Sequence, residues 1–434
     1  MDRTGRVRRS SRAGSLLAVS ALVPIPELGR RARAAARTLA TASTRQKDDA
    51  LAAAADLLVA RTDDVLAANA IDVERATAGG VTATVIDRLR LDAGRIEAMA
   101  AGLRQVAALP DPVGEVLDGW VRPNGLRITR VRVPLGVVAI IYENRPNVTS
   151  DAAGLCLKSG NVAFLRGSSG AISSNVAVAA AIREAYEKSG LPADALVLVE
   201  DTSRDAAVEF MQQREAIDCL IPRGGPSLIR SILDNATVPY VIDGDGNCHV
   251  YVDEAADLDM AARIVRNAKV QRPSVCNAAE NLLVHRAVAD AFLPAVAEVL
   301  DGVELVADPA ARALLPGAVE ATEADWDTEF LDLRLAVKVV DSLGEAIDHI
   351  ARHGSGHSEA IVTGSLDAAE RFVREVDAAA VLVNASTRFV DGEEFGFGAE
   401  IGISTQKLHA RGPMGLRELT TAKYVVRGDG QTRG

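Results

Sequence analysis

The chain has 434 residues, of which 48 % are apolar and 25 % charged, values typical of a globular protein that exclude a disordered, collagen-like or membrane-bundle chain. This length predicts two or three domains with a substantial buried core. Lys and Arg number 48 against 59 Asp and Glu, so the net charge is −11. The first 37 residues hold nine arginines against Asp2 and Glu27, a local charge of +7 that leaves about −18 for the rest. A body of this charge repels nucleic acid, and the 3 % of aromatic residues argues against a stacking platform for single strands.

Residues 1–23 form a basic extension that we expect to be disordered. Its arginines precede a short apolar run at residues 16–23, which superficially resembles an export signal. The run contains Ser20 and leads into Pro24-Ile25-Pro26 without a small-x-small cleavage site, so export is the weaker interpretation. No stretch of about 18 uncharged apolar residues occurs in the sequence, and we expect no membrane association and a cytoplasmic location.

Residues 27–109 carry a helical pattern. Leu51, Ala54, Ala55 and Leu58 recur at the spacing of one apolar helix face, and the alanine-rich composition has a high helix propensity. We predict several packed helices.

A β-hairpin is predicted next. Residues 110–114, Pro-Asp-Pro-Val-Gly, break the helical pattern, and residues 120–133 then alternate charged and apolar side chains around Asn124-Gly125. Residues 420–426 predict one late strand, which we expect to pair with the hairpin as an oligomerisation arm.

Between Pro134 and the late strand, short apolar runs alternate with helical segments, the pattern of βαβ units on a parallel sheet. The first series of predicted strands lies at residues 136–142, 162–165, 196–199, 219–221, 238–242 and 250–252, with helices at 172–188 and 227–235. The second series lies at residues 282–284, 335–340, 360–362 and 380–383, with helices at 258–270, 288–300, 343–352 and 366–376. The fold class is therefore α/β, with two doubly wound domains in series.

Two strand-to-helix loops are candidate anion sites. The motifs G-x-G-x-x-G, G-x-x-x-x-G-K-[ST], H-E-x-x-H and G-x-S-x-G are absent, and the six histidines show no metal-ligand spacing, so we expect no metal. In Arg166-Gly167-Ser168-Ser169-Gly170, the backbone N–H groups, the hydroxyls and the helix dipole suit a phosphate. In Arg223-Gly224-Gly225-Pro226, two glycines permit close backbone approach before a helix. A tight turn without a ligand is an equally good interpretation of either loop.

Four cysteines at positions 156, 219, 248 and 276 lack the spacing of a disulfide framework and suit reduced thiols. Cys276 stands near Arg272 and just before a predicted strand, a setting that allows the exposure and the nearby cation that a nucleophilic thiol needs. Cys156 and Cys219 lie in apolar runs and are interpreted as core thiols, whereas Cys248 fits either role.

Asn144 lies in Tyr-Glu-Asn-Arg-Pro-Asn, residues 142–147, where a buried strand ends in a turn. Its uncharged amide suits an oxyanion, and one such donor is worth roughly 10²–10³ in rate. A cap on the next helix is an equally good interpretation. His249, His285 and His409 are interpreted as structural or surface histidines.

Taken together, several segments resemble the aldehyde dehydrogenase superfamily and, within it, the γ-glutamyl phosphate reductase family. The matching segments are Tyr-Glu-Asn-Arg-Pro-Asn-Val-Thr at 142–149, Pro-Arg-Gly-Gly at 222–225, Gly-Asn-Cys-His-Val-Tyr-Val-Asp at 246–253, Gln-Arg-Pro-Ser-Val-Cys-Asn at 271–277, Gly-Ala-Glu-Ile-Gly-Ile-Ser-Thr at 398–405 and His-Ala-Arg-Gly-Pro-Met-Gly-Leu at 409–416. The similarity extends from about residue 24 to residue 426, more than nine tenths of the chain.

The resemblance implies an aldehyde dehydrogenase-like fold. Residues 24–116 and 134–250 would form an NADP-binding α/β domain, and residues 251–412 a catalytic α/β domain. Residues 117–133 and 413–434 would form the oligomerisation arm of a homo-oligomer.

The resemblance also implies a reaction, the NADPH-dependent reduction of L-glutamyl 5-phosphate to L-glutamate 5-semialdehyde with release of phosphate, in L-proline biosynthesis. Cys276 would attack the acyl phosphate to form a thioester, and the Asn144 side chain with the Cys276 backbone N–H would stabilise the oxyanion. A contact with glutamate 5-kinase, which would hand over the labile acyl phosphate, is a hypothesis that equal flux through mixed and separated enzymes would contradict.

For NADP(H), the resemblance places Arg166, with Gly167 and Ser168, near the adenosine ribose, Gly224 and Gly225 at the phosphate-side turn, and Glu329 at the nicotinamide ribose. Arg145, Arg272 and Arg411 are candidates for binding the carboxylate or the phosphate of the small-molecule substrate, because guanidinium forks match both anions.

One departure from the superfamily agrees with this chemistry. Hydrolytic aldehyde dehydrogenases carry a general-base glutamate in Glu-Leu-Gly-Gly, where this chain has Asp243-Gly244-Asp245-Gly246. The shorter acid should activate water poorly, which suits an enzyme that releases phosphate. The same stretch often carries a histidine in the reductase family, so an acid–base role there stays open.

Four alternatives remain. A hydrolytic aldehyde dehydrogenase would turn over without phosphate, and a thioester-exchanging enzyme would need coenzyme A. A catalytically silent scaffold would be favoured by the loss of Cys276 or of the Asn144 turn, and both are present. An arginine-tail nucleic-acid binder would show salt-dependent retention on a polyanion that disappears when residues 1–23 are deleted.

Overall fold

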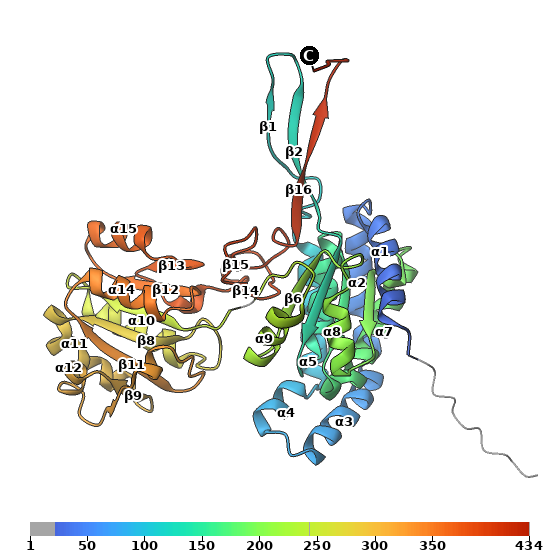
Figure 1. Ribbon diagram of the computed structural model, residues 1–434. Helices are drawn as coiled ribbons and strands as arrows, with labels where there is room; N and C mark the ends of the chain where they lie inside the picture. Colours follow the sequence, from blue (N-terminus) through green and yellow to red (C-terminus); the bar gives the residue numbers. More distant parts are fainter. Residues whose placement is uncertain (1–21, 243, 434) are drawn as a thin grey trace, which may run out of the picture.

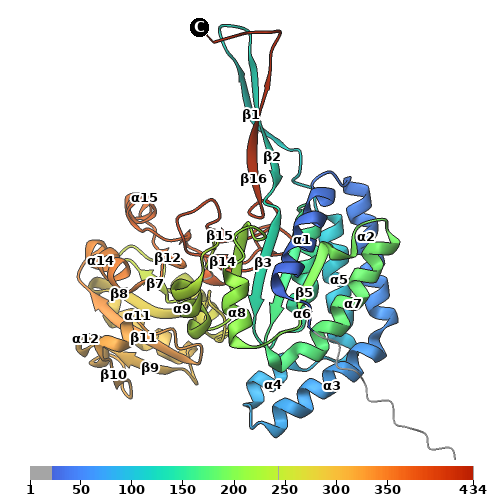
Figure 2. The same ribbon diagram turned by 45° about the vertical axis from the view of Figure 1, so that its right-hand side comes forward.

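The computed structural model describes residues 22–242 and 244–433, so the basic extension at residues 1–21 and Asp243 lie outside the described residues. Two α/β domains lie side by side, and a long β-sheet arm projects from the region between them (Figures 1 and 2). No helix of the described part of the chain is long and apolar enough to cross a bilayer.

The first domain is built on a four-stranded parallel sheet of order β5-β4-β3-β6. Its strands are β3 (Val137–Tyr142), β4 (Val162–Gly167), β5 (Leu196–Val199) and β6 (Cys219–Arg223). The predicted N-terminal helices are confirmed as α1 (Ile25–Leu39), α2 (Thr44–Ala60), α3 (Thr62–Ala78), α4 (Ala83–Leu89) and α5 (Ala93–Ala108). Four more helices follow, α6 (Asn147–Lys158), α7 (Ile172–Lys188), α8 (Arg204–Met211) and α9 (Pro226–Asn235), with short 3₁₀ turns η1 (Ser169–Ala171) and η2 (Ala193–Ala195).

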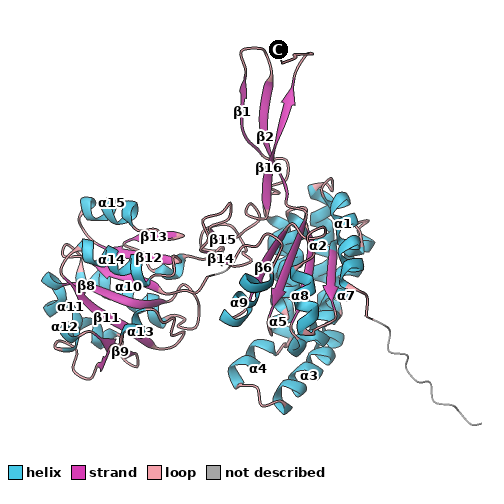
Figure 3. Ribbon diagram, viewed as in Figure 1, coloured by secondary structure: helices cyan, strands magenta, loops and turns pink. Residues whose placement is uncertain are grey.

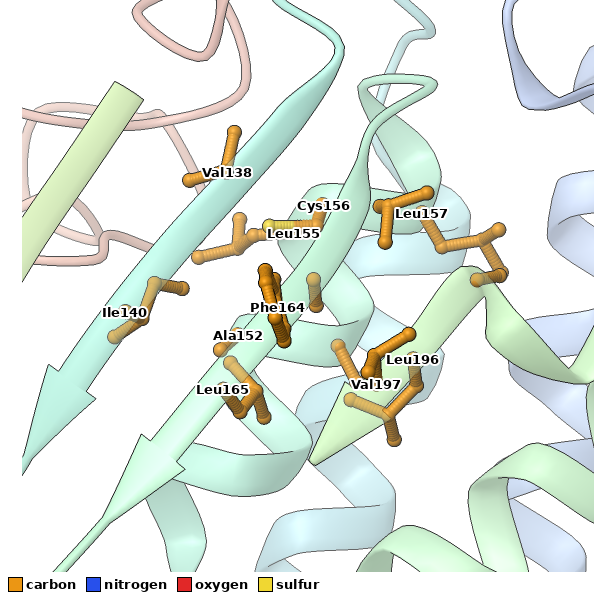
Figure 4. Packing of buried hydrophobic residues seen from close by; sticks show 14 of the residues in the cluster. Val138, Ile140, Ala152, Leu155, Cys156, Leu157, Phe164, Leu165, Leu196 and Val197 are labelled. Carbon is orange, nitrogen blue, oxygen red and sulfur yellow. The ribbon is translucent and has the colours of Figure 1, made fainter. Parts of the chain in front are cut away.

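Small aliphatic side chains fill the core of this domain. Every residue of β3 is buried, as expected for a parallel strand in a sheet that helices cover. Figure 3 shows these helices in cyan around the magenta strands of the first domain. Figure 4 shows Val138 and Ile140 of β3 beside Phe164 of β4 and the α6 residues that cover them. The Phe164 ring meets the ring of Phe210 from α8 edge to face, with 4.7 Å between centroids. The core thus ties the central strand to helices on both sides of the sheet.

The second domain is built on a seven-stranded parallel sheet of order β10-β9-β11-β8-β7-β12-β13. Its strands are β7 (Cys248–Val252), β8 (Ala279–His285), β9 (Glu304–Ala307), β10 (Val319–Glu320), β11 (Arg334–Val340), β12 (Ser358–Val362) and β13 (Ala380–Val383). Its helices are α10 (Leu258–Val270), α11 (Arg286–Val299), α12 (Pro309–Arg312), α13 (Glu323–Trp326), α14 (Leu343–His353) and α15 (Leu366–Glu375), with the turn η3 (Thr387–Phe389). The prediction of two α/β domains is therefore confirmed; β9 and β10 had not been predicted.

The arm consists of β1 (Val116–Val121), β2 (Arg127–Pro134) and β16 (Thr420–Arg427), all antiparallel. Gly125 takes a φ of +86° at the hairpin turn, which explains the need for glycine at this position. Both the hairpin and its pairing with the late strand are confirmed.

Two of the expected domain boundaries differ from the structure. The boundary expected at residue 250 falls inside β7, because β7 already pairs with β8 at Cys248. Residues of the loop that contains β14 (Ile403–Ser404) and β15 (Gly412–Pro413) pack into the core of the first domain, which the division at residue 412 had not foreseen; they are Ile401, Ala410, Met414, Leu416 and Leu419. The loop bridges the two domains in Figure 1.

The strand predicted at residues 238–242 is wrong. Among the described residues, this segment pairs with β6 through one isolated bridge between Leu220 and Tyr240. The Leu220 N–H donates to the Pro239 carbonyl, and the Val241 N–H donates to the Leu220 carbonyl. Pro239 has no N–H to donate, which limits the hydrogen bonds that this segment can form with a neighbouring strand.

Replacing Phe164 by Ala should lower the free energy of unfolding by about 3–5 kcal/mol, because a fully buried ring and its contact with Phe210 are lost. Denaturant unfolding measures the change. Ile71→Ala on the exposed face of α3 is the control, with an expected change within about 0.5 kcal/mol. Equal effects of the two substitutions would contradict this description of the core.

Candidate active site

Cys276 lies in the segment between α10 and β8 and is half-buried, whereas the other three thiols are buried. Burial raises the pKa of Cys219 to about 12 and holds the pKa values of Cys156 and Cys248 well above the ordinary thiol value. These three thiols stay protonated at neutral pH, as the interpretation of Cys156 and Cys219 as core residues requires. Cys248, left open by the sequence, donates from Sγ to the backbone carbonyl of Cys276 at 3.2 Å.

The segment before β7 packs closely against the backbone of Cys276. A Cβ added to Gly246 would overlap the carbonyl group of Cys276, so only glycine allows this approach. The Gly246 N–H in turn donates to Oε1 of Glu329 at 2.8 Å. Glu329, predicted to contact a ribose, therefore also anchors the segment on which Cys276 rests. Asp243, the shorter acid, lies outside the described residues.

Asn144 lies two residues after the end of β3, at the carboxyl edge of the sheet, with a φ of +39°. Its backbone N–H donates to Ser168 Oγ at 3.1 Å, and the same hydroxyl donates to Asn144 Oδ1 at 2.9 Å. A Cβ on Gly170 would overlap Oδ1, so a larger residue there would displace the Asn144 side chain from this position. Because Oδ1 accepts from Ser168, the amide NH₂ is the part of Asn144 that is left to serve as a donor.

The loops after β4 and β6 lie at the same carboxyl edge, where parallel sheets bind nucleotides. Gly225 is the N-cap of α9, which has no side-chain cap among the described residues, and a Cβ there would meet open space. The Gly225 N–H donates to Oε2 of Glu143 at 3.2 Å, so a carboxylate already stands where a helix N-terminus suits a phosphate. This turn fits the pyrophosphate of a dinucleotide.

Arg166 extends from β4 to the loop after β5. Its Nη2 donates to the carbonyls of Thr202 and Ser203 at 2.7 and 2.9 Å. Its Nε is buried and has no hydrogen-bond partner within the described ranges, 22–242 and 244–433. An unused buried donor at the edge of the nucleotide loops fits a ligand oxygen.

A cavity of about 530 Å³ lies where the two domains meet, next to the segment that carries Cys276. Ser274 and Val275 line it from the second domain, and helices α4 to α6 line it from the first. Five arginines face it: Arg88, Arg90, Arg95, Arg145 and Arg272. The structure thus brings two of the three predicted substrate-binding arginines, Arg145 and Arg272, into one cavity.

Arg388, in η3, is a further cation near Cys276. Burial and then the charge of Arg272 lower the pKa of Arg388, whereas Cys276 is among the groups that raise it. Two neighbouring guanidinium groups beside a thiol repel each other unless an anion lies between them. Asp391 and Glu394 offset part of this repulsion near Arg388, and an anionic ligand would offset more of it.

Arg411 lies apart from Arg145 and Arg272. Its Nη2 donates to Asp377 Oδ1 at 2.9 Å, and it lines a separate cavity next to α14 and α15. Lys407 forms an ion pair with the same carboxylate, and Arg411 Nε is buried without a hydrogen-bond partner among the described residues. Its role as a substrate ligand therefore stays a prediction.

Sequence analysis missed four residues of the cavity, Arg88, Arg90, Arg95 and Asp151, and it missed Arg388, which lines a separate cavity with Gln271 and Asp391. Asp151 had a usable signal, because it follows the Asn144 turn on the first turns of the next helix. Arg388 had none, since it reaches Cys276 only through the fold. Within the described ranges no group of three His, Cys, Asp or Glu side chains is arranged to hold a metal ion.

Comparison with known proteins identifies the family. A sequence profile described as the aldehyde dehydrogenase family matches residues 25–325. This chain belongs to the aldehyde dehydrogenase family. Membership makes it an oxidoreductase of a family that uses NAD(P), and the predicted aldehyde dehydrogenase fold is confirmed.

Within the family, the chain is similar to proteins named γ-glutamyl phosphate reductase. It is 58 % identical to the one from Moorella thermoacetica over 407 residues, 93 % of this chain and 97 % of the relative. It is 56 % identical to the one from Clostridium novyi over 404 residues, with the same coverage. The solved structure of the Thermotoga maritima protein of that name matches with a TM-score of 0.93 at 51 % identity, covering 95 % of this chain and all of the other. The resemblance seen in the sequence is confirmed.

More distant members share the fold. An acetylating aldehyde dehydrogenase from Geobacillus thermoglucosidasius matches with a TM-score of 0.67 at 18 % identity, covering 94 % of this chain and 97 % of the other. At this identity only the fold is comparable.

One thiol of the native protein, that of Cys276, should react with a disulfide reagent at neutral pH, and the other three only after unfolding, because buried protonated thiols are inert. Counting the released chromophore with time measures the reaction. Cys276→Ser should remove the fast phase, and Cys219→Ser should leave it unchanged. A fast phase that persists in Cys276→Ser would contradict this assignment.

Proposed function

We propose that the chain reduces L-glutamyl 5-phosphate with NADPH to L-glutamate 5-semialdehyde and phosphate, through a thioester on Cys276, in L-proline biosynthesis. The observation that carries the proposal is the half-buried thiol of Cys276 beside a cavity lined by five arginines. Identity of 56–58 % to relatives named γ-glutamyl phosphate reductase supports the substrate.

The thiolate of Cys276 attacks the carbonyl carbon of the acyl phosphate and forms a C–S bond. The C–O bond to the phosphoryl group breaks, and its electron pair leaves with the phosphate. Arg145 and Arg272, helped by Arg388, bind the phosphoryl oxygens and stabilise the charge on the leaving group.

The amide NH₂ of Asn144 and the backbone N–H of Cys276 donate to the carbonyl oxygen while it carries negative charge. Ser168 orients this amide through its hydrogen bond to Oδ1, so the donor is in place before the substrate binds. The same two donors stabilise the oxyanion again when the acyl group is reduced. Its collapse breaks the C–S bond, releases the aldehyde and returns the thiolate to Cys276.

Arg166, Gly167, Ser168, Gly224 and Gly225 would hold NADP(H) along the loops after β4 and β6. When bound, NADPH supplies the hydride that reduces the acyl group. A ribose hydroxyl could share Glu329 with Gly246, which would couple cofactor binding to the support of Cys276. For the dinucleotide phosphates to use the Gly225 N–H, Glu143 has to turn away from it.

The reverse reaction tests this proposal. Purified protein with L-glutamate 5-semialdehyde and NADP should form NADPH only when inorganic phosphate is present, and Cys276→Ser should lower the rate at least about 10³-fold because the nucleophile is lost. Absorbance of NADPH measures the rate, NAD in place of NADP measures the cofactor preference, and Cys219→Ser is the matched control. Turnover without phosphate would point to a hydrolytic dehydrogenase, and turnover that needs coenzyme A to a thioester-exchanging enzyme.

We also propose that the arm joins copies of the chain into a homo-oligomer. The side chains of Val116, Trp120 and Val121 on β1 and of Tyr424 and Val426 on β16 are between 44 % and 66 % exposed. The Trp120 and Tyr424 rings lie 6.3 Å apart, so they form one aromatic surface. An exposed apolar sheet with two unpaired edge strands, β1 and β16, is typical of a surface that another chain covers.

The double substitution Trp120→Asp and Tyr424→Asp should reduce the mass in solution by at least half, because charge on this surface opposes its burial. Light scattering after size exclusion measures the mass. Ile71→Asp, on exposed α3, should leave the mass unchanged. A monomeric wild-type protein, or a double variant of unchanged mass, would contradict the role of the arm.

A further inference from the structure

The arginine-lined cavity contains two carboxylates, Asp87 and Asp151, that the proposed acyl transfer does not use. Asp87 is largely exposed, and its Oδ1 accepts from Nη2 of Arg95 at 2.9 Å. Asp151 is half-buried near the N-terminus of α6, and its Oδ2 accepts from Nδ2 of Asn147 at 2.9 Å. Asp87 is therefore paired with a cation in direct contact, whereas Asp151 forms no ion pair within the described ranges.

A carboxylate inside a site for a phosphoryl group weakens the binding of that group, because like charges repel. Such a residue is useful only if the ligand also carries a cation. The substrate of the proposed reaction has one cationic group, the α-ammonium, in addition to its phosphoryl group and its α-carboxylate. The same cavity offers arginines for both anions, namely Arg145 and Arg272 together with Arg88, Arg90 and Arg95 near α4 and α5.

We propose that Asp151 binds the α-ammonium group of the substrate and thereby selects an α-amino acid over an acyl chain that lacks the amine. This inference rests on the proposed function and names the part of the substrate that the site recognises. Asn147 orients the carboxylate, and the ammonium group donates to it in a charge-assisted hydrogen bond.

The charge state of Asp151 supports this role. Burial raises the pKa of Asp151 to about 6, against the opposing influence of the Asn147 and Ser150 side chains and of Arg223 on β6. The other charged groups that line the cavity are Asp87 and the five arginines: Arg88, Arg90, Arg95, Arg145 and Arg272. The side chain is thus ionised at neutral pH and loses its charge as the pH falls through about 6, so affinity for the aminated substrate should fall over the same range.

The test compares L-glutamate 5-semialdehyde with 5-oxopentanoate, which has the same carbon chain and carboxylate but no amine. With phosphate and NADP, the wild-type protein should prefer the aminated substrate by about 10- to 100-fold in kcat/KM, as expected for one charged hydrogen bond. Asp151→Asn should lose most of this preference through a higher KM for the aminated substrate alone. Asp151→Glu, which keeps the charge, should retain part of it. Cyclisation lowers the free concentration of the amino aldehyde equally in every assay. The substrate preference of each variant is therefore compared with that of the wild-type protein.

Asp87→Asn is the matched control, since it removes a carboxylate from the same cavity and should leave the preference unchanged. Equal losses on both substrates in Asp151→Asn, or an unchanged preference, would overturn the inference. Calorimetric binding of L-glutamate and of glutarate provides a second measurement that needs no turnover. Tighter binding of L-glutamate that disappears in Asp151→Asn would support the inference even if the phosphate-dependent reaction fails, and equal binding of the two ligands by the wild-type protein would overturn it.

Discussion

The close packing of Gly246 under the carbonyl of Cys276 is the constraint on which the site depends. This contact fixes the position of Cys276 relative to the start of β7, and it leaves no room for a side chain at position 246. Cys248 and Glu329 hold the two sides of this contact, one by donating to the Cys276 carbonyl and the other by accepting from the Gly246 N–H. The first domain then only has to present Asn144 and the nucleotide loops to a thiol whose position is already set.

The charge that lines the cavity beside Cys276 is opposite in sign to the net charge of the chain. The chain is net negative, yet the cavity beside Cys276 is lined by five arginines, and Arg388 lies close behind. A cleft of one sign in a body of the other concentrates the field at the cleft and favours anionic ligands there. Asp151 adds one negative charge to this positive site, and an ammonium group on an otherwise anionic ligand gives that charge a partner.

Much of the site could be predicted because it lies in short segments whose local chemistry is distinctive. Cys276 and Asn144 stand at the ends of predicted elements, and the structure places both in the loops expected there, before β8 and after β3. The structure places Arg411 against Asp377, away from Arg145 and Arg272, and a guanidinium in a polar turn has the same local pattern whether it meets a ligand or a carboxylate of the protein. Arg388 was overlooked because its neighbours Arg272 and Cys276 lie more than 100 residues away in the chain, and Asp151 because its cavity is completed by residues 87–99 and 272–275.

The sequence by itself determined the helices, the hairpin and most of the strands, since periodicity, turn residues and propensity act over a few residues. It also determined the family, because the matching segments are long and ordered. The tertiary structure alone decided the order of strands in each sheet, the return of the residues around β14 and β15 to the first core, and which arginines share a cavity. These features depend on contacts between distant segments, and no local pattern encodes which of several equally suitable partners a side chain will meet.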